Sequence, residues 1–297
     1  MAGGKPIGFI GLGNMGGRMT RRLVDAGHTV LGFDLEPGRA QTCGALAAAS
    51  LAQLAHQTDI VLMSLPDSTV VEAVVEAEDG LLANARAGQV VVDLSTAAAS
   101  STRRLAQRFA QRGVSYVDAG ISGGAPAAEK GTLTLMVGGD AAVVDGLRGL
   151  FAAFSSKVVH MGASGAGHVT KLLNNFLNAV SLSATAEVMV AGKKAGLDLH
   201  QLLDVLNNSS GVNFATLNRF PHIVEGDYLE GGLTGRLMTK DVVLYVDLVR
   251  DLGIASLNAA GPLASFGLGN ALGYGDVISN RVVDAIGDVS GGVRLKS

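Results

Sequence analysis

Short apolar runs alternate with stretches of helical spacing along the first half of the chain. The runs predict strands at Ile7–Ile10, Thr29–Phe33, Ile60–Leu65, Val90–Leu94, Ser115–Val117, Leu133–Val137 and Lys157–His160. The stretches between them predict helices at Met15–Asp25, Ser68–Glu76, Ala98–Gln111 and Ala141–Phe151. Strands that alternate with helices are typical of βαβ units in a mainly parallel sheet. Two runs, at 60–62 and 90–92, are continuously apolar, which indicates strands covered on both faces.

The pattern changes after Gly165-Ala166-Gly167. From His168 to Ala191 there is neither glycine nor proline, and apolar residues fall at 169, 172, 173, 176, 177 and 180, which is helical spacing. A helix of about 24 residues spans roughly 36 Å. The rest of the chain has the pattern of helices and loops. We therefore predict a doubly wound α/β domain over residues 1–164 and an all-α domain over 165–297, which opens with this long helix.

Composition excludes several classes of protein. The 23 Lys and Arg residues and the 26 Asp and Glu residues give a net charge of −3 without a basic block, which argues against a nucleic-acid partner. The lone Cys43 excludes an internal disulfide, and neither His160 nor His168, which flank the domain junction, has a partner at ligand spacing, so we expect no metal. No signal-like segment follows Met1, and a soluble, cytoplasmic protein is expected.

One uncharged segment, Leu252–Gly275, is long enough to cross a bilayer. It contains Pro262, two asparagines and six glycines, so we interpret it as a buried helix with a loop. An apolar segment of this length needs cover from its own domain or from a second subunit. We therefore expect a homodimer or homotetramer formed through the helical domains.

A glycine motif follows the first predicted strand and opens the first helix. It has the G-x-G-x-x-G spacing and comprises Gly11, Leu12, Gly13, Asn14, Met15 and Gly16. Because 41 of the 297 residues are glycine, the spacing alone is weak support, but the strand-to-helix position is specific. There, glycines let a pyrophosphate approach the backbone, and the helix N-terminus offers unpaired N–H groups.

An acidic residue, Asp34, ends the second predicted strand. A carboxylate at this place accepts hydrogen bonds from the ribose hydroxyls of NAD and repels the 2′-phosphate of NADP. Arg39 complicates the choice, because it is close enough in sequence to meet a phosphate. The sequence therefore favours NAD as the cofactor, with NADP as the alternative.

Several further motifs, in order, make the chain similar to the β-hydroxyacid dehydrogenases, a family that includes 3-hydroxyisobutyrate dehydrogenase and tartronate semialdehyde reductase. The motifs are Gly11–Met19, Asp118–Gly124, Gly131–Gly139, Gly165–Asn175 and Lys240-Asp241. The resemblance implies a Rossmann-like domain, a long interdomain helix and a helical domain. Two departures, Gly120-Ile121 in place of the common Pro-Val and a missing proline near 254–258, affect the substrate more than the reaction type.

The resemblance also assigns roles to individual residues. It implies that Lys171 is the catalytic lysine and that Asn175 assists it. It implies that Ser122, Gly123 and Gly124 bind the substrate carboxylate. The residues that it places at the cofactor, besides the glycine motif and Asp34, are Leu65, Pro66, Thr96 and Lys240.

The chemistry of hydride transfer suits such a lysine. Reduction of a carbonyl leaves an oxyanion that must receive a proton, and an ammonium group supplies it when burial or a neighbouring cation lowers its pKa towards neutrality. Lys171 and Asn175 are four residues apart, hence on one helix face, and Asn178 continues this polar stripe. A solvated helix face is the alternative interpretation, although such faces are usually richer in Glu and Lys.

Three functions are compatible with these residues. The first is a dehydrogenase that interconverts a small β-hydroxy acid, such as 3-hydroxyisobutyrate, and its semialdehyde. The second is a reductase of tartronate semialdehyde, glyoxylate or succinic semialdehyde. The third is a noncatalytic nucleotide-binding scaffold. The presence of Lys171 argues against this scaffold and against an imine reductase.

Overall fold

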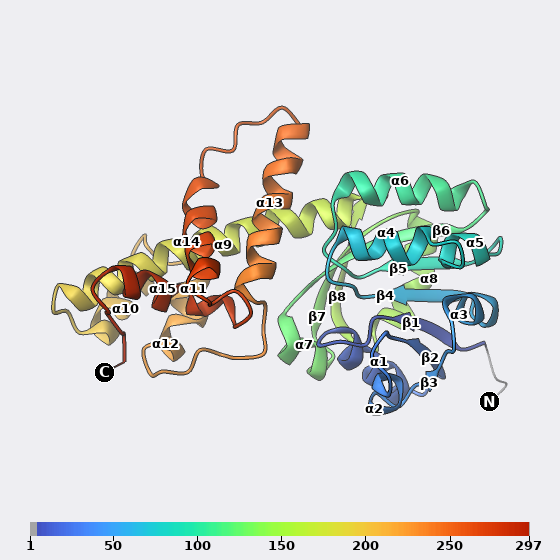
Figure 1. Cartoon of the computed structure of the whole chain (residues 1–297), viewed down its shortest axis with the longest axis horizontal. Coiled ribbons are helices and arrows are strands. Elements are labelled where there is room, and N and C mark those ends of the chain that lie inside the picture. The colour runs from blue at the N-terminus through green and yellow to red at the C-terminus, as the bar shows by residue number, and fades with distance from the viewer. Residues whose placement is uncertain (1–4, 297) are drawn as a thin grey trace. The chain divides into compact units, whose positions relative to one another are not determined.

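The computed structural model describes residues 5–296, which form two compact units, Met1–Lys171 (unit 1) and Leu172–Ser297 (unit 2). Figure 1 shows strands and helices in the first unit and helices in the second. The division falls inside one helix, α9 (Ala166–Lys194), so that its first turns pack in unit 1 and the remainder in unit 2.

Unit 1 contains one eight-stranded sheet in the order β3-β2-β1-β4-β5-β6-β7-β8. The strands are β1 (Ile7–Ile10), β2 (Val30–Phe33), β3 (Leu46–Ala47), β4 (Ile60–Met63), β5 (Val90–Asp93), β6 (Ser115–Ser122), β7 (Leu133–Gly138) and β8 (Ser155–Gly162). All neighbours are parallel except β6 and β7. The predicted mainly parallel sheet is therefore confirmed, and the carboxyl ends of β1, β4, β5 and β6 meet at one edge.

Helices cover both faces of this sheet. They are α1 (Gly16–Asp25), α2 (Arg39–Thr42), α3 (Leu51–Gln57), α4 (Ser68–Glu76), α5 (Leu81–Asn84), α6 (Ala99–Ala110), α7 (Gly124–Lys130) and α8 (Ala141–Phe151). One apolar core joins Phe9 of β1 to α1 and α8, and a second joins Ile10 to α4 and α6. Adjacent residues of β1 thus enter opposite cores, as the period of two in a strand requires.

The differences from the predicted elements have local causes. Strand β6 extends five residues beyond Val117, through the glycine-containing segment 118–122, because antiparallel pairing with β7 holds it from Asp118 to Ser122. The predictions omitted β3 and the helices α2, α3, α5 and α7, which have at most seven residues each and too few apolar positions to show a period. Helix α9 is longer than predicted at both ends.

Unit 2 is built of helices around a core that includes Phe176, Leu182 and Met189 of α9. The helices after α9 are α10 (Leu199–Asn207), α11 (Phe214–Asn218), α12 (Phe220–Ile223), α13 (Gly235–Asp251), α14 (Ala260–Ala271), the 3₁₀ helix η1 (Ser279–Arg281) and α15 (Val282–Val289). Within the described part of this unit there is no strand, only an isolated bridge between Thr234 and Ile278. The predicted all-α architecture is confirmed.

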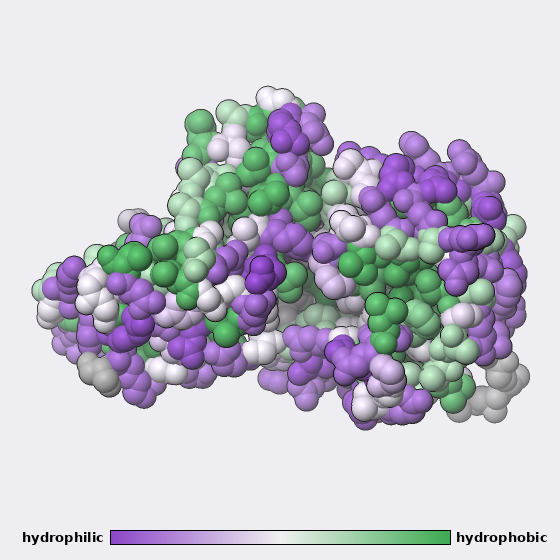
Figure 2. Space-filling view, viewed as in Figure 1, coloured by the Kyte–Doolittle hydropathy of each residue, from purple (hydrophilic) through white to green (hydrophobic). Residues whose placement is uncertain are grey.

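The uncharged segment Leu252–Gly275 divides into a loop and α14. Phe266 of α14 is buried, as predicted, but the loop before α14 exposes Leu252, Ile254 and Leu257, the last of them 84% exposed. Figure 2 shows hydrophobic residues gathered over the region of α13 and α14. The interpretation as a buried helix with a loop agrees with α14 and the loop before it, and the exposed apolar side chains lie in that loop. Among residues 5–296 no helix combines the length and apolar character that a membrane span needs.

Candidate active site

The glycine motif forms the turn between β1 and α1. Gly11 has φ +83°, and a Cβ added there would lie 2.3 Å from the Ser64 carbonyl oxygen. A Cβ on Gly16 would lie 1.8 Å from the Gly11 carbonyl oxygen, so a side chain is excluded at both positions. A Cβ added to Gly13 would have Arg39 Nη1 as its nearest neighbour, 3.2 Å away, and this atom is at the tip of a long side chain. The loop therefore closes tightly at its ends and leaves its middle accessible, which fits the approach of a pyrophosphate.

Asp34 follows β2 and binds this loop directly. Its Oδ2 accepts a hydrogen bond of 2.7 Å from the Leu12 N–H, and its Oδ1 accepts one of 2.9 Å from the Glu36 N–H. Arg39 Nε lies 3.9 Å from Asp34 Oδ1, but the guanidinium donates to Glu36 Oε2. This hydrogen bond with Glu36 raises the pKa of Arg39. Glu36 therefore holds Arg39, the residue that the sequence suggested as a possible partner for the 2′-phosphate of NADP.

The loops after β4 and β5 lie at the same edge of the sheet. They contain Leu65 and Pro66 after β4, and Thr96 after β5. Leu65 N–H donates to Ser95 Oγ over 3.0 Å, which ties the two loops together. Asp93 in turn accepts from the Ser95 N–H (3.0 Å) through Oδ1. Because β1, β4 and β5 are neighbours, these predicted cofactor positions share one edge with the glycine loop.

A buried carboxylate caps the first turn of α9. Asp118 of β6 is fully buried, and its two oxygens accept from Gly165 N–H (2.6 Å) and His168 N–H (2.8 Å). These N–H groups belong to a helix N-terminus, where a negative charge is favoured. The His168 ring is also buried and lies 2.7 Å from Thr102 Oγ1. The start of α9, which carries Lys171, is therefore fixed on the sheet.

Lys171 packs against strand β6 at Gly120. A Cβ added to Gly120 would lie 2.5 Å from Lys171 Cβ and 3.1 Å from its Cγ, so only glycine allows this approach. Ser122 is two residues further along β6 and therefore points to the same face of the strand as position 120. Lys171 itself is half-buried. In the sequence, Gly120 is visible only as a departure from the family pattern, and its contact with Lys171 was not predicted.

The segment Ser122-Gly123-Gly124 leads from β6 into α7. Gly123 and Gly124 have φ of +122° and +66°, and both are exposed. A Cβ on Gly123 would lie 2.5 Å from Ala127 Cβ, whereas the surroundings of Gly124 are open up to Pro126 Cδ at 3.8 Å. This exposed turn of backbone at the carboxyl end of β6 can offer N–H groups to an anion.

In unit 2, Asn175 and Lys240 meet at one buried carboxylate. Asn175 is 4% exposed, and its Nδ2 donates to Asp241 Oδ2 over 2.5 Å. Lys240 Nζ lies 3.1 Å from Asp241 Oδ1. Asp241 is almost fully buried, so it needs these partners. Of the Lys240-Asp241 motif, only Lys240 was predicted as a site residue. The carboxylate next to it in the sequence was the signal that could have added Asp241.

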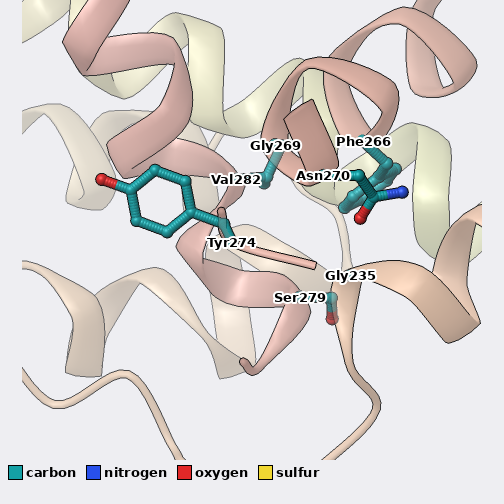
Figure 3. A pocket seen from close by; sticks show the side chains of 7 residues that line it. All are labelled: Gly235, Phe266, Gly269, Asn270, Tyr274, Ser279 and Val282. Carbon is teal, nitrogen blue, oxygen red and sulfur yellow. The ribbon is translucent and has the colours of Figure 1, made fainter. Parts of the chain in front are cut away.

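Unit 2 also contains a small cavity, separate from these residues. Its volume is about 10 Å³, about the space that one water molecule needs, and it is lined by Gly235, Phe266, Gly269, Asn270, Tyr274, Ser279 and Val282 (Figure 3). Substrate pockets commonly have about 300–1,000 Å³. The cavity holds none of the predicted site residues, and we do not assign it to substrate.

Over residues 5–296 no group of three His, Cys, Asp or Glu side chains is arranged to hold a metal.

A sheet with a glycine loop, an acidic residue after β2 and further loops at one edge is the architecture of a dinucleotide-binding domain. Family comparisons agree. Residues 6–162 match the NAD-binding domain of 6-phosphogluconate dehydrogenase, and residues 165–275 match a domain described as NAD-binding of NADP-dependent 3-hydroxyisobutyrate dehydrogenase. The protein is an NAD(P)-dependent dehydrogenase that acts on CH–OH groups.

Full-length relatives narrow the class. The chain is 34% identical to 2-(hydroxymethyl)glutarate dehydrogenase of Eubacterium barkeri, over 91% of this chain and 90% of that one. It is 40% identical to NAD-dependent L-serine dehydrogenase of Pseudomonas aeruginosa, over 81% and 84%. The structure of 3-hydroxyisobutyrate dehydrogenase of Mycobacterium tuberculosis with L-serine superposes with a TM-score of 0.86 at 30% identity, over 95% and 99%. The chain belongs to the 3-hydroxyisobutyrate dehydrogenase-like family of β-hydroxyacid dehydrogenases.

Proposed function

We propose that the protein interconverts a small β-hydroxy acid of the 3-hydroxyisobutyrate type and its semialdehyde, with Lys171 as the general acid and base. The substrates named for the three relatives share one chemical unit. In each of them a CH₂OH group is attached to the carbon that bears the carboxylate. We therefore propose 2-substituted 3-hydroxypropanoates as the substrate class.

The contact of Lys171 with Gly120 carries this proposal. It brings the stem of the lysine onto the face of β6 that also presents Ser122. A substrate carboxylate bound by Ser122, Gly123 and Gly124 would leave the neighbouring alcohol carbon near the lysine. Asn175, one helical turn after Lys171, would donate to or accept from the same alcohol oxygen, with Asp241 holding its amide.

The proposed chemistry needs one proton transfer by the protein. A bound nicotinamide cofactor would supply the hydride acceptor for oxidation of the alcohol carbon, and the hydride donor for the reverse reaction. In oxidation the neutral Lys171 amine takes the hydroxyl proton as the carbonyl forms. In reduction the Lys171 ammonium gives that proton to the developing alkoxide. A positioned acid or base of this kind contributes about 10²–10⁴-fold to the rate.

We propose that Gly11–Gly16, Asp34, Leu65, Pro66, Thr96 and Lys240 hold the cofactor, and that NAD is preferred. The engagement of Arg39 by Glu36 supports this preference, because the arginine would have to leave Glu36 to meet a 2′-phosphate. The cytoplasm stays the expected location.

Steady-state kinetics test the proposal. Purified protein would be assayed with NAD and NADP against 3-hydroxyisobutyrate, L-serine and 2-(hydroxymethyl)glutarate, and in reverse against tartronate semialdehyde, glyoxylate and succinic semialdehyde. We expect the highest kcat/KM for a 2-substituted 3-hydroxypropanoate with NAD. Turnover confined to glyoxylate or succinic semialdehyde would overturn the substrate class.

A further inference from the structure

One arginine of unit 2 differs from the others in its charge environment. The unit contains five arginines, and four of them lie within 4 Å of a carboxylate: Arg236 of Asp276, Arg250 of Asp247, Arg281 of Asp284, and Arg294 of Asp288. Arg219, between α11 and α12, has no such partner among the described residues. It is partly buried, and burial lowers the pKa of its guanidinium to about 10. The side chain is still a cation near neutral pH, and its charge is not compensated.

The guanidinium of Arg219 lies 5.7 Å from the centroid of the Phe214 ring and donates to two neutral amides. Its Nη1 donates to Asn280 Oδ1 over 2.6 Å, and its Nη2 donates to Asn178 Oδ1 over 3.0 Å. A guanidinium only donates, so it fixes the orientation of both amides. The Asn178 oxygen faces Arg219, and its NH₂ group is left to donate elsewhere. Two donor groups, one of them cationic, therefore stand next to each other.

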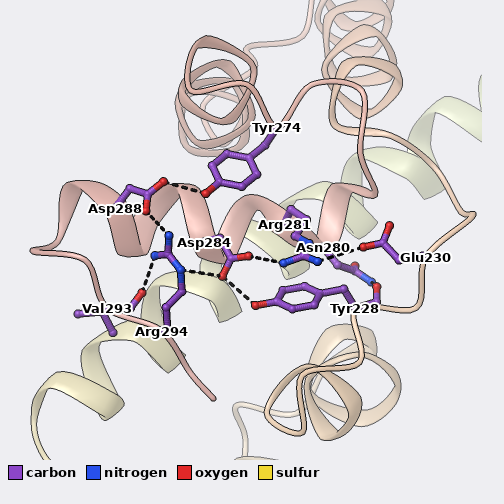
Figure 4. Close-up of polar contacts among 9 residues, drawn as sticks. All are labelled: Tyr228, Glu230, Tyr274, Asn280, Arg281, Asp284, Asp288, Val293 and Arg294. Atoms are coloured by element: carbon purple, nitrogen blue, oxygen red, sulfur yellow. Dashed lines mark hydrogen bonds and ion pairs between the residues drawn. The ribbon is translucent and has the colours of Figure 1, made fainter. Parts of the chain in front are cut away.

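Asn280, one of the two amides that Arg219 contacts, lies next to a network of ion pairs. The Asn280 amide donates from Nδ2 to the Tyr228 carbonyl oxygen over 2.8 Å. Next to it, Arg281 pairs with Asp284 (2.9 Å) and lies 3.6 Å above the Tyr228 ring (Figure 4). The carboxylates of this network are occupied by Arg281, Arg294 and the tyrosine hydroxyls. Asn280 is thus rigidly held, and it presents only its amide oxygen to Arg219.

Asn178 connects Arg219 to the proposed catalytic residues. Lys171, Asn175 and Asn178 lie at positions i, i+4 and i+7 of α9, which share one helix face. Seven residues of helix correspond to about 10 Å along its axis. Asn178, and with it the Arg219 guanidinium that it contacts, therefore lies on the face of α9 that carries Asn175, about one turn further along the helix.

We infer that Arg219 and the Asn178 amide form a subsite for a second anionic group of the substrate, a carboxylate at the end of the C2 substituent. The inference rests on the proposed function, since it names the substituent within that substrate class. A guanidinium with an adjacent amide donor suits a carboxylate, which accepts from both. The alternative is a structural clamp that joins α9 to η1, and it predicts no dependence on the substituent.

The first test compares substrates and variants. 2-(Hydroxymethyl)glutarate has a second carboxylate and 3-hydroxyisobutyrate has a methyl group. We expect Arg219→Gln to lower kcat/KM for the dicarboxylate by about 10–100-fold, the worth of a hydrogen bond to a charged group, and to leave that for 3-hydroxyisobutyrate within about 3-fold. Arg250→Gln removes an exposed, ion-paired arginine and should change neither value. An equal loss for both substrates would mean that Arg219 is a clamp.

The second test needs no variant. The wild-type protein should favour 2-(hydroxymethyl)glutarate over its neutral terminal amide by at least about 10-fold in kcat/KM. Equal values would overturn the subsite even if Arg219→Gln does not fold.

Glutarate binding to the NAD-loaded protein, measured by calorimetry, separates the two proposals. If no hydroxy acid is turned over but glutarate binds in an Arg219-dependent way, the proposed function fails and the subsite stands. If hydroxy acids are turned over and neither rates nor glutarate binding depend on Arg219, only the subsite fails.

Discussion

The two units fix their functional side chains by different means. In unit 1 the partners are largely backbone groups: Asp34 accepts from Leu12 N–H, and Asp118 accepts from Gly165 and His168 N–H. In unit 2 the partners are side chains on other helices, as in Asn175 with Asp241 and Arg219 with Asn178. Backbone geometry can bind a cofactor that many enzymes use, whereas side-chain pairs can be exchanged for others without altering the fold. We therefore expect unit 2 to carry the substrate specificity.

The largest effect should come from Lys171. Lys171→Ala should lower kcat by about 10²–10⁴-fold while NADH affinity, measured by titration, changes little. Lys171→Arg should restore little activity, because a guanidinium keeps its proton near neutral pH. If Lys171→Arg retained most of the wild-type kcat, the residue would attract the substrate electrostatically rather than transfer a proton.

Gly120 tests whether backbone geometry in unit 1 sets the position of that lysine. Gly120→Ala would push a Cβ against Lys171 and should lower kcat by up to about 10²-fold, since displacements of about 1 Å have such effects. The matched control is Gly149→Ala on α8, where an added Cβ meets no atom within 4 Å. A wild-type kcat in Gly120→Ala would show that the contact does not matter for catalysis.

Asp241 tests the side-chain anchoring in unit 2. Asp241→Asn removes the charge that faces Lys240 and replaces one of the two carboxylate oxygens with an NH₂ donor, so the side chain can no longer accept from both Lys240 and Asn175 through separate oxygens, and kcat/KM should fall by about 10-fold or more. Asp276→Asn, on an exposed ion pair, serves as the control. Equal stability of the two variants in urea, with loss of activity only in Asp241→Asn, would identify a positioning role.

Cofactor choice tests Asp34. The wild-type protein should show higher kcat/KM with NAD than with NADP, and Asp34→Asn should narrow that ratio by about 10-fold, the effect of one charge-assisted interaction. A wild-type preference for NADP would instead point to Arg39.

The smallest effect on activity is expected for assembly. Sedimentation at micromolar concentration should show a homodimer or homotetramer, in which the exposed Leu252, Ile254 and Leu257 would gain cover. Leu257→Asp should shift the equilibrium towards monomer while kcat per chain changes little. A wild-type protein that sediments only as monomer contradicts the prediction.

The sequence predicted unit 1 in more detail than unit 2 for physical reasons. The strand periods and the glycine loop depend on residues that are close together in the chain. Glycine at fixed spacing also indicates the backbone geometry of this loop, and Asp34 follows the next predicted strand. Arg219 lies 41 residues from Asn178 and 61 from Asn280, and Asn175 lies 66 from Asp241. No local pattern predicts such pairs. Gly120 was visible in the sequence, but its contact with Lys171 depends on how closely α9 approaches β6.

The carboxylate of Asp118 has a consequence for dissecting the chain into fragments. A fragment that stops at residue 164 would lose Gly165 and His168, whose N–H groups this carboxylate binds, together with the turn of α9 that covers it. Hydrogen bonds to a charged group are worth about 1.5–3 kcal/mol each, a large part of the stability of an ordinary domain. An expression fragment of the sheet unit should therefore extend through Lys171, so that the first turns of α9 travel with the strands that they cap.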